Sequence, residues 1–126
     1  MHLKKYERKD EESLISLLKK EGWDCYTSTN TIEKYKKALL ESITYVAYEE
    51  NTLCGYSRSL DDYGFYIYIC DLLVDRDYRN NKIGQKLMEQ LCIDYPEHDI
   101  YVMSDEDKFY LKKGYIREGS IFKLNR

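Results

Sequence analysis

ICDLLVDRDYRNNKIGQKLMEQLCIDY, residues 69–95, is the segment that decides the fold of this chain. Residues 69–74 are apolar apart from Asp71, which is typical of a short strand covered on both faces. Residues 75–81 contain no apolar side chain except Tyr78, so we expect them to form a solvated turn. Residues 69–81 therefore predict a buried strand followed by a polar turn.

A long amphipathic helix is predicted to follow the turn. Its apolar residues recur with helical spacing along one stripe: Ile83, Leu87, Met88, Leu91, Cys92 and Tyr95. Pro96 has no backbone N–H to donate and is expected to end the helix. The first turn of a helix leaves about four backbone N–H groups without partners and carries a partial positive charge. A turn that enters such a helix is therefore well suited to bind phosphate.

The residues around this turn fit an anion site. Gly84 has no side chain that would keep a ligand from the backbone. Positive charge is supplied by three neighbouring side chains, those of Arg79, Lys82 and Lys86. Taken alone, these residues are equally consistent with an ordinary strand, a solvated basic turn and a helix.

The composition is that of one compact domain spanning residues 1–126. Hydrophobic residues make up 43% and charged residues 34% of the chain, as in a soluble globular protein. The net charge of −3 argues against nucleic acid as the main partner. No apolar run approaches the roughly 20 residues that span a bilayer, and the N-terminal MHLKKYERKDEE is not a signal peptide. We therefore expect a cytoplasmic protein with no membrane partner.

Cysteine and tyrosine usage adds two expectations. The four cysteines, Cys25, Cys54, Cys70 and Cys92, lack the spacing of a metal site and are interpreted as reduced core residues. The 14 tyrosines could line a pocket that has apolar walls and hydroxyl tips. Tyrosine also fills strands well, and we favour that interpretation for most of them.

The other segments predict alternating helices and strands in one mixed α/β domain. Strands are expected at residues 3–8, 43–48, 52–60, 65–74 and 100–103, and two more short ones between residues 115 and 124. Asp10 is expected to cap a helix that ends at Gly22, and Asn30 to start a second helix with Glu33 in a capping box. Residues 23–29 are expected to form a loop. A short helix is predicted from Ser104 to Lys113.

Two motifs in the second half resemble the GCN5-related N-acetyltransferase (GNAT) superfamily. LLVDRDYRNNKIGQKLM, residues 72–88, is similar to its acetyl-CoA-binding signature, whose core is Gln/Arg-x-x-Gly-x-Gly/Ala. Arg79 and Gly84 match the first and last positions of that core, and Lys82 stands where the family usually has glycine. FYLKKGY, residues 109–115, resembles a Phe-Tyr-x-Lys-x-Gly-Phe segment near the end of many such enzymes.

The resemblance implies an α/β (mixed α+β) fold in three layers. A central, mostly antiparallel sheet of about six or seven strands would splay apart at the cofactor site, with about four helices packed around it. The implied activity is acetyl-CoA-dependent transfer of an acetyl group to a primary amine of a small molecule, without a metal. A homodimer is also implied, because terminal strands in this family often meet across a dimer.

The resemblance also implies where acetyl-CoA would lie. Backbone N–H groups at the start of the helix would hold the pyrophosphate, and they belong to Arg79, Asn80, Asn81, Lys82, Ile83, Gly84 and Gln85. The pantetheine arm would pair with the strand-edge backbone of Leu72, Leu73 and Val74. The Lys82 side chain could crowd the phosphates or add its ammonium group to them, and we favour the second.

Direct attack by an amine requires proton transfers at both ends of the reaction. An amine with a pKa near 10 is mostly protonated at neutral pH, and the departing thiolate benefits from an acid. Tyr110 occupies the family's tyrosine position and is the candidate acid, although it could instead be a core tyrosine beside Phe109. Asp71 is the candidate base, or the anchor of a water that relays the proton. A purely structural carboxylate is the equal alternative for Asp71.

By analogy with the family, the acceptor pocket would contain Trp23, Tyr26, Arg58, Asp61, Asp62, Tyr66 and Tyr68. Aromatic and acidic side chains together favour a cationic amine, whereas Arg58 would favour an acceptor with a carboxylate. Two other functions remain open. One is acetylation of a protein or peptide, and the other is a coenzyme A-binding module without turnover, which the lysine at position 82 supports.

Overall fold

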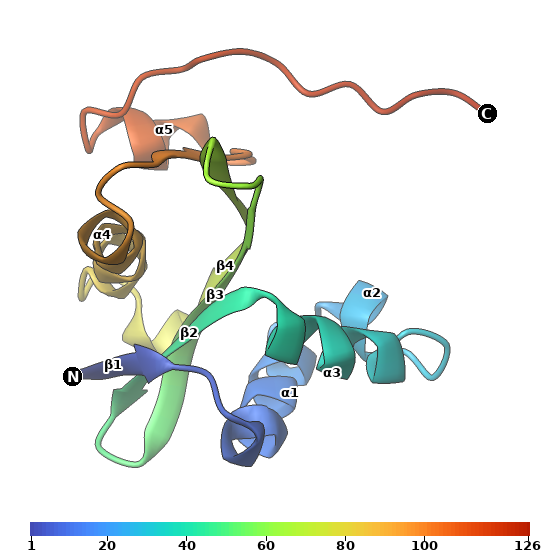
Figure 1. The fold of residues 1–126 in the computed structure, drawn as a ribbon. Coiled ribbons are helices and arrows are strands. Elements are labelled where there is room, and N and C mark those ends of the chain that lie inside the picture. Colours follow the sequence, from blue (N-terminus) through green and yellow to red (C-terminus); the bar gives the residue numbers. More distant parts are fainter.

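The computed structural model describes all 126 residues and contains a five-stranded sheet with helices on both faces (Figure 1). Its elements in chain order are β1 (His2–Lys5), the 3-10 helix η1 (Arg8–Asp10), α1 (Glu11–Lys20), α2 (Asp24–Thr27), α3 (Ile32–Glu41), β2 (Ile43–Glu49), β3 (Thr52–Asp61), β4 (Tyr66–Val74), the 3-10 helix η2 (Arg76–Tyr78), α4 (Ile83–Asp94), β5 (Asp99–Val102) and α5 (Asp107–Leu111). The strands lie side by side in chain order. All neighbouring strands are antiparallel except β4 and β5, which are parallel.

The sheet separates two hydrophobic cores. On one face, α1 and α3 pack on Val46, Tyr56 and Leu73 of the strands. On the other face, α4 packs on Ile67 and Ile69 of β4 and on residues of β2 and β3. The apolar stripe predicted for α4 is confirmed at its buried positions, Ile83, Leu87, Met88 and Leu91, whereas Cys92 is exposed. Burial of these two faces supplies most of the driving force for folding.

The start of α4 lies very close to the sheet because β3 carries a glycine there. A Cβ atom on Gly55 would lie 3.1 Å from Ile83 Cγ2 and 3.1 Å from the backbone oxygen of Leu73. Both distances are tighter than ordinary van der Waals contacts, so any larger residue would push α4 away from the sheet. Gly55 thus fixes where the first turn of α4 sits relative to β4.

An irregularity in β4 turns Asp71 away from α4. The register between β3 and β4 shifts between Arg58 and Ser59, so that Cys70 is an extra residue opposite this pair. Side chains two residues apart normally lie on the same face of a strand. Because of the extra residue, Ile67 and Ile69 face α4, whereas Leu73 belongs to the core beneath α1 and α3. The predicted polar interruption of this strand therefore lies on the α1–α3 side of the sheet.

The second half of β4 has a free edge. β5 pairs with β4 only from Tyr66 to Ile69, where they match Asp99 to Val102. Beyond Ile69 no strand lies on that side of β4, although β3 continues to pair along the other side as far as Val74. The free edge that the predicted splay would leave is thus present, because β5 ends at Val102.

The prediction of six or seven strands and about four helices was wrong. The sheet has five strands, because residues 115–126 form no strand and leave α5 as an extended segment (Figure 1). Ile116, Phe122 and Leu124 of this segment are largely exposed. Five α-helices are present, because the predicted loop at residues 23–29 contains the short helix α2. The mixed α+β architecture itself is confirmed.

Several local details also differ from expectation. The carboxylate of Asp10 does not cap α1, because it accepts hydrogen bonds from Lys4, the Glu7 amide and Tyr48. The second helix starts after Thr31 and not at Asn30, without a side-chain cap. Of the four free cysteines only Cys54 is a core residue; Cys70 is half-buried, and Cys25 and Cys92 are exposed. None of the helices combines the length and apolar character that a membrane crossing requires.

Candidate active site

The backbone from Arg79 to Gln85 offers a run of free donors at the start of α4. None of its N–H groups donates to a backbone acceptor in the protein, and no side chain caps the helix. The first amide that closes the helix is that of Lys86, which donates to the Lys82 oxygen at 3.0 Å. These donors and the positive end of the helix together form the arrangement that binds phosphate.

Two residues of this turn adopt left-handed backbone conformations, Asn80 with φ of 72° and Lys82 with φ of 61°. Asparagine tolerates this region better than most residues, whereas lysine has a steric cost there. Glycine adopts a positive φ freely. The left-handed backbone at Lys82 therefore explains why the signature usually has glycine at this position: the shape of the turn requires a positive φ.

The free edge of β4 leads directly to these donors. Leu72 and Val74 are half-buried, and Leu73 is buried in the core beneath α1. Arg79 Nε donates to the carbonyl oxygen of Val74 (3.1 Å), so the last residue of the strand is tied to the turn that follows it. Strand-edge groups and helix donors therefore lie along one continuous stretch of chain.

The structure brings the two predicted motifs together. A Cβ atom built on Gly84 would lie 3.5 Å from the ring of Phe109, and the Gln85 side chain accepts a hydrogen bond from Lys113 (3.1 Å). Tyr110 is half-buried against the α4 side of the core, with its ring 5.0 Å from that of Phe109. Burial, and to a lesser extent the negative charge of Asp105, raise the pKa of Tyr110 above its ordinary value of 10.0. Tyr110 therefore keeps its proton throughout the neutral range.

Asp71 lies at the centre of a buried polar cluster on the other face of the sheet. Its carboxylate accepts hydrogen bonds from Tyr26 (2.6 Å), Tyr35 (2.7 Å) and Arg58 Nε (2.6 Å), and the residue is only 3% exposed. The Tyr35 hydroxyl also lies 2.6 Å from that of Tyr56. Because Tyr35 gives its proton to Asp71, Tyr56 donates to Tyr35. Tyr26 comes from α2, Tyr35 from α3, and Tyr56 and Arg58 both from β3.

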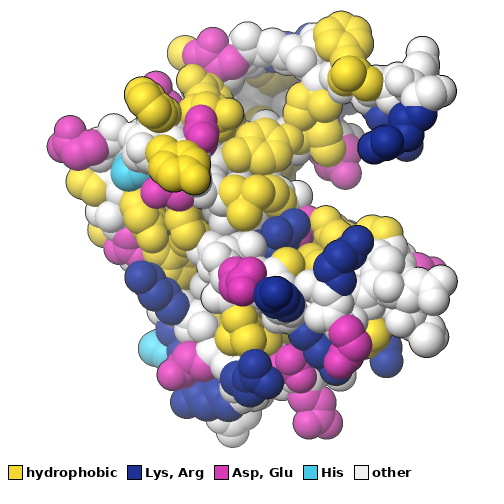
Figure 2. Space-filling view, turned by 45° about the vertical axis from the view of Figure 1, so that its right-hand side comes forward, with side chains coloured by type: hydrophobic (Ala, Val, Ile, Leu, Met, Phe, Trp, Pro, Cys, Tyr) yellow, Lys and Arg dark blue, Asp and Glu magenta, His cyan; other side chains and the backbone are white.

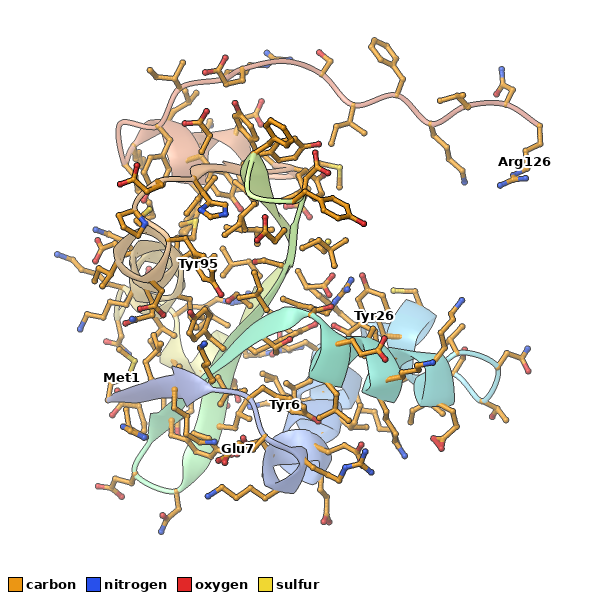
Figure 3. The ribbon with its side chains drawn as sticks, viewed as in Figure 1. Met1, Tyr6, Glu7, Tyr26, Tyr95 and Arg126 are labelled. Carbon is orange, nitrogen blue, oxygen red and sulfur yellow. The ribbon has the colours of Figure 1, made fainter.

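The charges and rings of this cluster support one another. Burial raises the pKa of Tyr26 to about 12, and the hydrogen bond to Asp71 acts in the same direction. Burial alone would lower the pKa of Arg58, but the hydrogen bond and charge of Asp71 outweigh it and raise the pKa. The rings of Tyr26 and Tyr35 stack with centroids 4.0 Å apart, and the Arg58 guanidinium lies near both. Tyr26 projects from α2 toward the sheet (Figure 3).

The predicted acceptor residues fall into two groups. Tyr26 and Arg58 meet at Asp71, and Trp23 packs against Tyr26. The rest lie near the other end of β3 and β4. There Tyr66 contacts Tyr101 of β5, and the Asp61 carboxylate lies 3.4 Å from His98 Nε2. Tyr68 pairs with Leu60 across the two strands, and the Asp62 N–H donates to the Tyr66 oxygen in the turn between them. Figure 2 shows a hollow between the α2–α3 part of the molecule and the C-terminal segment, with hydrophobic side chains on its inner wall.

Sequence reasoning missed several residues that the structure places at these sites. Tyr35 and Tyr56 complete the Asp71 cluster, yet both have the spacing of ordinary core residues. Glu21, Lys20 and Arg76 form ion pairs beside the turn before α4, and no local pattern singles them out. No group of three or more His, Cys, Asp or Glu side chains is arranged to hold a metal ion.

The chain matches the family model of an acetyltransferase (GNAT) domain over residues 41–117. The protein therefore belongs to the GNAT family of acetyltransferases, as the two motifs predicted. No curated protein matches the sequence at a significant level.

Solved structures of acetyltransferases share this fold. A GNAT family acetyltransferase from Streptococcus pneumoniae has a TM-score of 0.78 and 25% identity, covering 99% of this chain and 98% of its own. Glucosamine-6-phosphate N-acetyltransferase from Arabidopsis thaliana has a TM-score of 0.74 and 18% identity, with 98% and 97% covered. An aminoglycoside 6'-N-acetyltransferase in complex with coenzyme A has a TM-score of 0.68 and 19% identity, with 81% and 61% covered.

The backbone of Lys82 can be tested by substitution. We expect Lys82→Gly to be more stable than Lys82→Ala by about 1 kcal/mol, because both variants lose the lysine side chain but only glycine adopts this φ without steric cost. Urea unfolding of the two variants measures the difference. Equal stabilities, or a more stable alanine variant, would contradict a left-handed conformation at this residue.

Proposed function

We propose that the protein is an N-acetyltransferase that transfers the acetyl group of acetyl-CoA to a primary amine of a small molecule. The observation that carries this proposal is the continuous track of backbone groups from the free edge of β4 to the unpaired N–H groups of residues 79–85. The family membership of the chain supports the same donor, and so does a relative that was solved with coenzyme A.

The two ends of this track suit the two ends of the cofactor. The N–H groups from Arg79 to Gln85 would hold the pyrophosphate, since they lack protein acceptors. The edge from Leu72 to Val74 would pair with the amides of the pantetheine arm, as an added strand does. Lys82 is exposed at the turn, so its ammonium group can stand beside the phosphates without filling their site.

Acetyl-CoA supplies the thioester from which the amine takes the acetyl group. In the proposed reaction the neutral amine nitrogen bonds to the carbonyl carbon, the carbon–sulfur bond breaks, and the nitrogen releases a proton to solvent water. Tyr110, which its raised pKa keeps protonated at neutral pH, donates its hydroxyl proton to the departing sulfur and regains one from solvent. Much of the acceleration would come from positioning the two reactants beside the free edge of β4.

For the acceptor we propose a small cationic amine. The aromatic side chains of Trp23 and Tyr26, which lie together beside Asp71, would attract such a molecule. Tyr66 and Asp61, at the other end of β3 and β4, would contact only a longer acceptor. Arg58 is already neutralised by Asp71, which weakens the case for an acceptor that binds through a carboxylate. The names of two structural relatives, an aminoglycoside acetyltransferase and a glucosamine-6-phosphate acetyltransferase, also point to amines of small molecules.

The proposed activity is tested by following thiol release from acetyl-CoA. We expect release with at least one member of a panel of polyamines, aminoglycosides and amino acids, and little with peptides. Release only with peptides would favour a protein or peptide acetyltransferase. Thermal stabilisation by coenzyme A without release across the panel would favour a binding module that lacks turnover.

Replacement of the proposed acid should separate chemistry from binding. We expect Tyr110→Phe to lower kcat by about 10- to 100-fold, in line with the usual contribution of a positioned acid, and to leave the affinity for coenzyme A unchanged. Tyr63→Phe, at an almost fully exposed position, is the matched control. Since Tyr110 acts in its protonated form and its pKa lies above 10.0, we expect no alkaline loss of activity from this group below that pH. An unchanged kcat would exclude Tyr110 as the acid.

The surroundings of Asp71 favour its structural alternative over the role of base. A carboxylate that already accepts three short hydrogen bonds has little capacity left for an incoming proton. Its donors come from α2, α3 and β3, so Asp71 links these elements to the irregular part of β4. We therefore assign Asp71 a positioning role.

Asp71→Asn tests this assignment. We expect a loss of about 3 kcal/mol in unfolding free energy, because Arg58 would be left buried without its counter-charge. The pH dependence of kcat in the surviving enzyme should be the same as in the parent. Loss of an acidic limb from that profile would instead identify Asp71 as the base. Tyr26→Phe removes a single donor and serves as the milder variant.

A further inference from the structure

The carboxylate of Glu21, just after α1, binds two arginines of the turn before α4. Glu21 Oε1 accepts a hydrogen bond from Arg79 Nη2 at 2.8 Å. Glu21 Oε2 accepts hydrogen bonds from Arg76 Nε at 3.3 Å and from the Arg76 backbone N–H at 3.1 Å. One carboxylate thus contacts both a main-chain group and two side chains of the turn, although it lies more than 50 positions earlier in the sequence.

Glu21 is the enclosed member of this group. Its side chain is 4% exposed, whereas those of Arg76 and Arg79 are 60% and 53% exposed. An enclosed carboxylate is stable only if its partners stay in place, because a lone buried charge is costly. The arginines are therefore held over Glu21 on their inner side while they remain open to solvent on the other.

A second group of charges fixes the beginning of the same turn. Lys20 donates to Asp75 (2.8 and 2.9 Å) and to Asp77 (2.8 Å). Burial alone would raise the pKa of Asp75, but the bonds from Lys20 and from the Asp77 amide hold it below the usual value. Lys20, the last residue of α1, and the following Glu21 thus contact the turn at Asp75, Arg76, Asp77 and Arg79.

The turn needs such support because its own contacts are few. The residues between η2 and α4 make two hydrogen bonds to nearby backbone. Asn81 Nδ2 donates to the Tyr78 oxygen, and Arg79 Nε donates to the Val74 oxygen. Two of its residues have left-handed conformations that carry a steric cost. A segment of this kind samples other shapes unless neighbouring contacts hold it, and its N–H groups then no longer converge on one ligand.

We propose that Glu21 is a positioning residue for coenzyme A: it clamps Arg76 and Arg79 and so holds the turn in the shape that presents its backbone N–H groups to the pyrophosphate. The inference rests on the proposed function, and it adds to the binding site a residue just after α1 that does not touch the ligand. Binding is tighter when a site is already in its bound shape, because less ordering accompanies association.

Electrostatics alone predicts the opposite effect, which makes the test decisive. Replacing Glu21 by glutamine removes one negative charge beside the phosphates, and this change alone would strengthen the binding of an anion. If Glu21 merely competed with phosphate for the two arginines, the substitution would release them and affinity would rise. Weaker binding despite the more favourable charge is the result that loss of the shape of the turn predicts.

The experiment is calorimetric titration of Glu21→Gln with coenzyme A. We expect the dissociation constant to rise about tenfold, which corresponds to the ordering of one or two mobile side chains and their loop. Glu12→Gln is the matched control, because Glu12 is exposed on the same helix, forms no ion pair and carries the same charge. Its affinity should equal that of the parent chain. Unchanged or tighter binding by Glu21→Gln would overturn the proposal.

Kinetics and a second variant separate positioning from a general loss of stability. Glu21→Gln should raise the KM for acetyl-CoA while kcat and the KM for the amine stay close to the parent values. Arg76→Lys keeps the charge but loses the guanidinium contact with Glu21, and it should weaken coenzyme A binding in the same direction. A uniform fall in active protein, with all constants unchanged in the folded fraction, would contradict positioning.

Limited trypsin digestion tests the clamp without any ligand. The turn contains cleavage sites after Arg79 and Lys82, and we expect cleavage there to be at least about threefold faster in Glu21→Gln, relative to cleavage elsewhere in the chain. The same relative rate in the parent and in Glu12→Gln is the baseline. If the parent does not bind coenzyme A but Glu21→Gln still speeds cleavage, the proposed function is refuted and the clamp is not. If the parent binds coenzyme A but Glu21→Gln is cut at the same relative rate as the parent, the clamp is refuted and the proposed function is not.

Discussion

The end of β5 opposite Ile69 of β4 is the constraint on which the candidate site depends. Had β5 continued alongside β4, the edge from Cys70 to Val74 would be covered by another strand. Because it stops, this edge stays open, and the chain passes from it into a turn whose N–H groups have no protein partners. Backbone groups of this kind bind a ligand by position and not by side-chain identity. The short signature around Arg79 and Gly84 is consistent with that.

The irregular register of β4 gives the two faces of the sheet different roles. Ile67 and Ile69 pack under α4, which carries the proposed phosphate site, whereas Asp71 meets Tyr26, Tyr35 and Arg58 on the other face. One extra residue at Cys70 is enough to produce this change of face. The strand therefore contacts the α4 core on one side and the Asp71 cluster on the other.

Tyrosine hydroxyls repeatedly bind carboxylates of other elements, of which Asp71 and Asp10 are buried and Asp94 is exposed. Asp71 is bound by Tyr26 and Tyr35, Asp10 by Tyr48, and Asp94 by Tyr45. A buried carboxylate without donors would be strongly destabilising, and a tyrosine brings a donor together with a large apolar surface. Only six of the 14 tyrosines lie in strands, so the expectation that most of them fill strands was wrong, and bonds between separate elements account for Tyr26 and Tyr35 among the others.

The sequence by itself determined the family, the mixed architecture and the strand–turn–helix segment, because periodic apolar residues and the two motifs are local signals. It also located Gly84 and Phe109, which the fold then brings into contact. It could not predict the five-stranded sheet, the helix α2 or the donors of Asp71, since these depend on which distant segments meet. The same holds for Glu21, whose partners follow it by more than 50 residues. Only the tertiary structure decides such pairs, because an ion pair between separate elements leaves no spacing in the sequence from which it could be read.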